Sequence, residues 1–234
     1  MLKRSEILEI LETAKRIDSR YKLPGADKHK YRLNPPISAS FVRALEEKYS
    51  FTFPTDYFHF ITEIGDGGAG PYYGIFPFED FMKKDFYTDY RNSLKNEFAP
   101  RPMKLDDTNY YIVTPQKDFL ENPSKYYVYE KADKDSDCLY DGIYPFCTPG
   151  CYSDFCLVVT GEMRGKILYT DNMGAYELIA NSFEEFYQNW LNCISDTENL
   201  HKEIGERRIF GKKTIFGYLH KFRFIPHRKP SDNP

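Results

Sequence analysis

The chain has 234 residues, is 41% hydrophobic and 17% aromatic, and carries a formal net charge of −3. This size and composition favour a single domain with a substantial core in which many aromatic rings pack together. No run of about 18 apolar residues occurs and the N-terminus is charged and amphipathic, so we expect a cytoplasmic protein without a membrane span or signal peptide.

The charge is distributed unevenly along the chain. Residues 206–234 contain eight Lys or Arg and two acidic residues, so this tail carries +6 and residues 1–205 carry −9. An acidic body disfavours nucleic acid and favours a basic protein partner, because clustered like charge steers association. A solvated surface that only maintains solubility explains the same composition.

Two amphipathic helices are predicted before residue 50. Residues 5–19 repeat apolar side chains at helical spacing, with Glu and Lys on the opposite face, and should pack on the main core. Pro35 and Pro36 end an extended link. Ser38 can then cap a second helix, whose inward face is spaced at four-residue steps: Phe41, Leu45 and Tyr49.

Residues 54–76 combine a third helix with a glycine turn. Pro54 suits the first turn of this helix, and Gly65 would end it in a left-handed cap. Residues 72–76 then have the composition of a strand. The predicted structural turn consists of Gly65, Gly67, Gly68, Gly70, Pro71 and Gly74.

The spacing of Gly65, Gly67 and Gly70 also matches the Gly-x-Gly-x-x-Gly fingerprint of dinucleotide-binding proteins. That fingerprint follows a strand and opens a helix, because the helix N-terminus binds the pyrophosphate. Here the predicted helix comes first, and Pro71 leads into a β-type run. No Gly-Lys-Ser/Thr follows the glycines, which also excludes a phosphate loop. We therefore expect no cofactor at this turn.

The second half of the chain is predicted to form a sheet and a closing helix. Six segments have β-type composition: residues 110–114, 126–130, 143–146, 156–160, 166–170 and 176–180. Ser182 and Glu185 form a capping box that opens a helix with an aromatic inward face. Helices, then a meander, then a helix indicate an α+β fold with a largely antiparallel twisted sheet of about five to six strands and helices packed around it.

Candidate metal and catalytic motifs are weak. The spacing Cys147-x3-Cys151-x4-Cys156 lacks the Cys-x2-Cys pairs and the nearby His of structural zinc sites, and an odd total of five cysteines favours reduced thiols. The acidic segment 131–141 fails the calcium-loop register, since Cys138 and Tyr144 stand where Gly and Glu are required. The five His residues are isolated in sequence, so we expect no metal site and no local catalytic motif.

Several segments resemble the SUKH superfamily, in the order in which that superfamily carries them. The most specific is G-D-G-G-A-G-P-Y-Y-G-I-F from Gly65, which follows P-x-D-Y-x-x-F-I-x-x-I from Pro54. Weaker matches are the prolines and helix of residues 35–53, G-C at 150–151, L-V-V-T-G at 157–161, G-x-I-x-x-x-D at 165–171 and S-F-E-E-F-Y-x-x-W-L at 182–191. The resemblance covers about residues 31–195, and Tyr169 stands where Trp is commoner.

With this resemblance the chain divides into an N-terminal amphipathic helix and link (residues 1–30), a SUKH-like domain (31–205) and a basic aromatic C-terminal extension (206–234), in a single compact domain overall. The extension can be a docked segment or edge strand, or it can stack on single-stranded nucleic acid or lie on a membrane. The resemblance implies the α+β domain of bacterial immunity proteins, which neutralise toxins, often nucleases, and of fungal regulators of cell-wall synthesis. Neither role uses a cofactor.

These observations give three hypotheses. The leading one is a non-enzymatic intracellular immunity protein that occludes a basic cognate toxin without cofactor, nucleic acid or membrane. The second is a regulatory scaffold of the cell-wall type, and the third is an enzyme whose site is assembled from distant residues. Tyr72 and Tyr73 alternate along the predicted strand, so at least one should face the core. The predicted partner-binding residues are Asp66, Tyr72, Tyr73, Asp133, Asp135 and Asp137.

Overall fold

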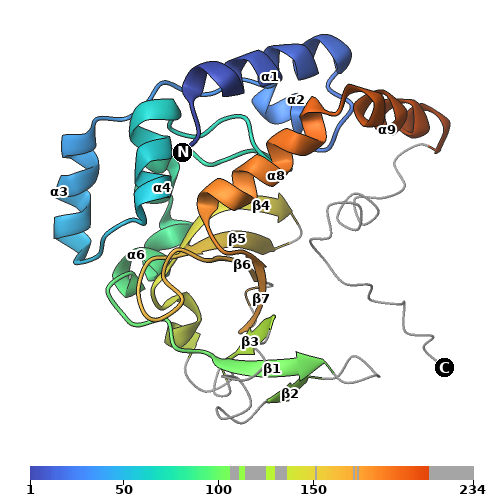
Figure 1. Cartoon of the computed structure of the whole chain (residues 1–234). Helices are drawn as coiled ribbons and strands as arrows, with labels where there is room; N and C mark the ends of the chain where they lie inside the picture. The colour runs from blue at the N-terminus through green and yellow to red at the C-terminus, as the bar shows by residue number, and fades with distance from the viewer. Residues whose placement is uncertain are drawn as a thin grey trace.

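The computed structural model describes residues 1–105, 111–113, 125–129, 136–150, 152–170, 172 and 174–210 (Figure 1). Most of its helices precede the sheet, and the predicted closing helix follows it together with a second helix that was not predicted. In chain order the helical elements are α1 (Arg4–Ile17), α2 (Ala26–His29), α3 (Ala39–Tyr49), α4 (Thr55–His59), the π-helix η1 (Phe60–Ile64), α5 (Phe78–Lys83), the 3-10 helix η2 (Asp85–Tyr87), α6 (Thr88–Ser93), the 3-10 helix η3 (Ser136–Tyr140), α8 (Phe183–Ser195) and α9 (Thr197–Phe210).

The described strands form one antiparallel sheet of seven strands, in the order β2-β1-β3-β7-β6-β5-β4. The α+β class and the antiparallel sheet are confirmed, and each of the six predicted segments overlaps a strand of the sheet. The additional strand is β1, whose Pro102 and Lys104 obscure its β-type composition. The strands are β1 (Arg101–Leu105), β2 (Tyr111–Val113), β3 (Tyr126–Val128), β4 (Ile143–Gly150), β5 (Ser153–Val158), β6 (Ile167–Thr170) and β7 (Ala175–Ala180).

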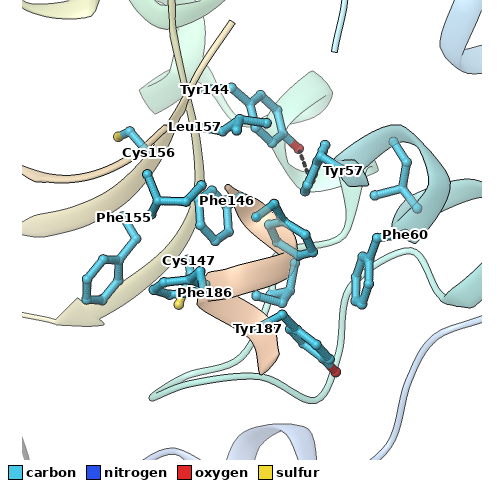
Figure 2. Close-up of a cluster of buried hydrophobic side chains, with 14 of the residues drawn as sticks. Tyr57, Phe60, Tyr144, Phe146, Cys147, Phe155, Cys156, Leu157, Phe186 and Tyr187 are labelled. Carbon is cyan, nitrogen blue, oxygen red and sulfur yellow. Dashed lines mark hydrogen bonds between the residues drawn. The ribbon is translucent and has the colours of Figure 1, made fainter. Parts of the chain in front are cut away.

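The core lies between the sheet and the helices α4 and α8, and it is built largely from aromatic rings (Figure 2). The Tyr57 and Phe183 ring centroids are 4.9 Å apart, and the Tyr57 hydroxyl donates to that of Tyr144 at 3.2 Å. Ser182 accepts the Glu185 N–H at 3.0 Å, which confirms the predicted cap of α8. The predicted inward face of α8 is also buried: Phe183, Phe186, Tyr187, Trp190, Leu191 and Ile194.

Helix α3 differs from its prediction in the face that it buries. Its buried residues are Val42, Leu45 and Glu46, whereas Phe41 is 50% exposed. Glu46 accepts the N–H of Phe53 at 2.7 Å, so this buried carboxylate holds the link to α4. Because this hydrogen bond satisfies the buried Glu46 carboxylate, α3 can bury the face that carries Glu46. Ser38 precedes α3 but makes no side-chain capping bond.

Helix α1 belongs to the same compact body as the sheet. It contacts α8 and α9 (Figure 1). Its Ile7, Leu11 and Ala14 side chains are buried. The predicted packing of this amphipathic helix on the core is confirmed. Most of the predicted C-terminal extension, residues 211–234, lies outside the described residues.

The glycine turn (residues 65–76) joins the helices that precede it to the sheet through hydrogen bonds. Gly68 donates its N–H to the Ile75 carbonyl at 2.8 Å, and a single bridge joins Ile75 to Cys147 of β4. On the other side, the Tyr187 hydroxyl donates to the Ala69 carbonyl at 2.8 Å. The turn therefore sets the position of α4 relative to β4 and α8.

Two predictions about this turn are wrong. Gly65 has φ 176°, an extended conformation, because the helix ends in the π-helical η1 and not in a left-handed cap. A side chain there is excluded sterically, since a Cβ would lie 2.8 Å from the Asn34 carbonyl oxygen. Residues 72–76 form no strand, because Tyr72 and Gly74 have left-handed φ values of 50° and 89°.

Candidate functional site

An exposed aromatic side chain lies among acidic residues between α5 and α6. Phe86 of η2 is 67% exposed, and Asp85 and Asp89 on either side of it are exposed as well. Glu79 and Asp80 of α5 each pair with a lysine one turn later, whereas Asp85 and Asp89 form no ion pair within the described part of the chain. We call Asp85, Phe86 and Asp89 the acidic patch.

Buried rings hold the acidic patch in place from below. Tyr87 directly follows Phe86 and Tyr90 directly follows Asp89, and both tyrosines are buried. The Tyr87 ring packs 5.7 Å from that of Phe81 in α5, and the Phe86 ring packs edge-on 5.2 Å from Tyr87. The short helices are thus fixed by side-chain packing, which presents Phe86 outward at little ordering cost.

Asp66, a predicted contact residue, caps the helix that leads to the patch. Its Oδ1 atom accepts the Phe78 N–H at 2.9 Å, at the first residue of α5. Burial raises the pKa of the Asp66 carboxyl, and Glu79 and Asp80 add to the rise, while the bond from Phe78 opposes it. The Asp66 carboxylate thus already accepts a hydrogen bond from the protein's own backbone. Contact between Asp66 and a partner remains a prediction.

The predicted acidic loop ends beside this patch. Helix η3 packs on α6, with the Tyr140 ring centroid 4.5 Å from that of Tyr90. Burial raises the pKa of Tyr140, and Asp89 contributes to that rise. Asp137 lies in η3, whereas Asp133 and Asp135 lie outside the described residues. The fold therefore brings the end of segment 131–141 close to the acidic patch, although about 50 residues separate them in sequence.

The two predicted tyrosine contacts are placed differently. Tyr72 is buried and its ring stacks on that of Phe155 at 5.6 Å, so we correct its assignment from partner contact to core residue. Tyr73 is 41% exposed, and its ring lies over β4, where a Cβ on Gly150 would approach it to 3.1 Å. One of the pair faces the core, as the sequence analysis expects.

The β4–β5 turn presents a second exposed tyrosine, which the sequence analysis missed. Tyr152 is 91% exposed on a backbone with φ 61°. The Asn172 side chain holds this backbone, because its Nδ2 atom donates to the Tyr152 carbonyl at 2.9 Å and to Asp154 at 3.2 Å. Asn172 Oδ1 accepts the Tyr90 hydroxyl at 2.7 Å. The dipeptide Pro149-Gly150 is a local sequence signal of a turn here.

A shallow groove of about 620 Å³ lies between the end of α3 and the β5–β6 turn. Three of its charged residues bind other groups of the protein: Arg43 pairs with Glu46, and Arg164 donates to the Thr52 and Phe53 carbonyls at 3.1 and 2.8 Å. This engagement gives the enzyme hypothesis no support. Within the described ranges no three His, Cys, Asp or Glu side chains could hold a metal ion, and no helix is long and apolar enough to cross a membrane.

Residues 36–189 match the SMI1/KNR4 family (SUKH-1). The chain belongs to this family. The SUKH-1 region includes the glycine turn, the acidic patch and the β4–β5 turn, and it leaves α1, α2 and α9 outside. The resemblance inferred from the sequence is thereby confirmed. Searches among curated proteins and among solved structures gave no significant match.

Proposed function

We propose that this SUKH-1 protein is an intracellular immunity protein that binds and neutralises a cognate toxin by direct occlusion. SUKH domains often occur in immunity proteins, and the SMI1/KNR4 family is generally non-catalytic. The observation that carries the proposal is the acidic patch, where Phe86 projects between two exposed carboxylates.

The chemistry of the patch fits a basic toxin, such as a nuclease. A nuclease needs a positively charged cleft for the phosphates of its substrate, and carboxylates in that cleft compete for the same positive charge. Phe86 supplies the apolar anchor, while Asp85 and Asp89 supply charge complementarity around it. The adjacent helix η3 extends the contact area.

The test is coexpression with a candidate toxin domain from a neighbouring gene, followed by affinity measurement on the purified pair. We expect the wild-type chain to rescue growth and copurify with the toxin. Phe86→Ala and the double variant Asp85→Lys/Asp89→Lys should each weaken binding by about 10-fold or more. Leu8→Ala and Glu9→Lys/Glu47→Lys are matched controls, because these exposed side chains lie on α1 and α3.

Two results would contradict different parts of the proposal. If the chain neither rescues growth nor forms a complex, toxin neutralisation is wrong for that toxin. If the complex forms and the patch variants bind as tightly as the controls, the chain is an immunity protein that uses another surface.

A regulatory scaffold is the second candidate. It is favoured by a second exposed surface of opposite charge, at residues 20–32 beside Tyr73, because a scaffold holds more than one partner. Deletion of the gene in a strain that also lacks the toxin separates the two functions. An immunity protein is dispensable there, whereas loss of a scaffold still changes growth or the cell wall.

A further inference from the structure

The acidic patch is connected by packed rings to a second aromatic side chain at the surface, Tyr140 of η3. Tyr140 is half-buried, and its ring centroid lies 4.5 Å from that of Tyr90. The Tyr90 centroid lies 6.1 Å from that of Tyr87, which in turn lies 5.2 Å from that of Phe86. These spacings are typical of aromatic pairs, so the four rings form one continuous row. Its two middle members are buried, and its ends, Phe86 and Tyr140, reach the surface.

Each end of this row has a carboxylate beside it. Asp89 lies three residues after Phe86 and four after Asp85, and this spacing places the three side chains on one side of the adjoining helices η2 and α6. Asp89 is also close to Tyr140, because burial raises the pKa of the Tyr140 hydroxyl most and the charge of Asp89 adds to that rise. The patch thus presents carboxylates together with aromatic rings.

The cations nearest in sequence are bound to other groups. Lys83 and Lys84 each pair with an acidic residue of α5 one turn earlier. Arg91 donates to the Lys84 carbonyl and to the Thr88 hydroxyl, both at 2.9 Å. Because Arg91 comes two residues after Asp89 in α6, the two side chains point to different sides of the helix. Among the described residues, the patch carboxylates therefore keep their charge available for a partner.

We propose that the acidic patch and Tyr140 bind arginine side chains of a basic protein in preference to lysine side chains. The guanidinium groups pair with Asp85 and Asp89 and lie against the rings of Phe86 and Tyr140. A guanidinium is planar and more weakly hydrated than an ammonium, so it can stack on a ring while it pairs with a carboxylate. Carboxylates alone attract both cations, whereas a ring beside a carboxylate favours arginine.

This inference rests on the proposed function, because it specifies the side chain by which the same patch recognises its basic partner. Arginine is enriched at protein interfaces and among the residues that dominate binding energy, whereas lysine is depleted there. The row of rings is also held from inside, since Asn172 Oδ1 accepts the Tyr90 hydroxyl at 2.7 Å. Phe86 and Tyr140 are thus packed on fixed neighbours, which lowers the entropy lost on binding.

The test compares labelled octa-arginine with octa-lysine, whose side chains carry equal charge, by fluorescence anisotropy with the full chain at about 50 mM salt. We expect octa-arginine to bind about 10-fold more tightly. The double variant Phe86→Leu/Tyr140→Leu keeps apolar contacts with the buried rings but offers no aromatic face. It should reduce the ratio of the two Kd values to about 2 and leave the affinity for octa-lysine nearly unchanged.

Two further variants separate the rings from the charge. Phe86→Tyr/Tyr140→Phe should keep the wild-type ratio, because both rings remain. Asp85→Asn/Asp89→Asn should weaken the binding of both peptides by about 5-fold, because it removes the attraction common to the two cations.

Matched controls remove the same groups elsewhere. Tyr73→Leu removes an exposed ring from the glycine turn, and Glu9→Gln/Glu47→Gln removes exposed carboxylates from α1 and α3. Neither control should change the ratio of the two Kd values. The inference is overturned if the chain does not bind octa-arginine, if it binds the two peptides equally, or if Phe86→Leu/Tyr140→Leu keeps the wild-type ratio.

These outcomes are distinct from failure of the proposed function. A chain that prefers arginine but neutralises no toxin uses the site for another basic protein. A chain that neutralises its toxin without the preference is an immunity protein whose patch does not select arginine, and this result overturns the inference alone.

Discussion

Burial determines the protonation state of His29. Its ring makes edge contacts with Tyr31 and Trp190, at centroid distances of 5.3 and 6.0 Å. Burial lowers the pKa of the imidazole to about 4, against a small opposing effect of Asp27. The neutral ring also has the lone pair that accepts the Tyr31 N–H. His29 is therefore a structural group that connects the segment of residues 18–32 to α8.

This pKa predicts acid sensitivity. The unfolded chain protonates His29 near pH 6.5 and the folded chain only near pH 4, so its contribution is complete above pH 6.5 and is lost as pH falls toward 4. The loss approaches about 1.4 kcal/mol per pH unit within this window. His29→Asn, which keeps an acceptor, should flatten the dependence of urea unfolding free energy on pH between about pH 7 and 5.

At the scale of one element, the glycine turn depends on close backbone approach as much as on dihedral freedom. Gly68 has φ 98°, and a Cβ there would lie 2.3 Å from the Arg32 carbonyl oxygen. Gly165, in the β5–β6 turn, has nearly the same φ of 95°, but no atom lies within 4 Å of an added Cβ. The two positions therefore separate backbone strain from steric exclusion.

Substitution of these two glycines should give unequal losses of stability. Gly165→Ala should cost about 1 kcal/mol, the strain of a left-handed alanine. Gly68→Ala should cost about 3 kcal/mol or more, because the added Cβ must also displace the backbone at Arg32 from the glycine turn. Chemical denaturation of both variants measures the difference. Equal losses would show that the contact between Gly68 and Arg32 relaxes without cost.

At the scale of the whole molecule, elements outside the SUKH-1 match are joined to those inside it. Helix α1 lies outside the matched residues and α8 lies largely within them, yet the two pack together. Their shared core includes Leu11 of α1, which is 1% exposed. This packing indicates that residues 1–30 unfold together with the rest of the described chain.

Cooperative unfolding can be tested with Leu11→Ala, which should cost about 2–5 kcal/mol by leaving a cavity. The single Trp, Trp190, is buried on α8 and reports on that helix by fluorescence, while far-UV circular dichroism reports on all helices. Both signals should shift to lower denaturant by the same amount. A shift in the dichroism alone would mean that α1 unfolds as a separate unit. Leu8→Ala, on the exposed face of α1, is the matched control.

Local patterns in the sequence predict most of the helices and strands, but they do not predict which exposed side chains lie together on the surface. Helix α8 is correctly predicted because its cap and its apolar spacing lie within one short segment. The acidic patch could not be predicted, since its position beside η3 depends on contacts between distant segments. Tyr72 and Tyr73 also required the structure, because a left-handed residue in the turn breaks strand alternation. The concentration of cations in residues 20–32 was not predicted, because net charge was averaged over 205 residues.

The attachment of the glycine turn to β4 restricts the way in which a partner can bind at that edge of the sheet. Strand β4 is the last strand of the sheet, but Phe76 donates its N–H to the Phe146 carbonyl at 2.8 Å, and Pro145 has no N–H. A peptide that extends a sheet needs a row of available backbone groups. Main-chain pairing, which tolerates many partner sequences, is thus obstructed at β4. Recognition there depends on side chains, so surface substitutions can change partner specificity while the fold is retained.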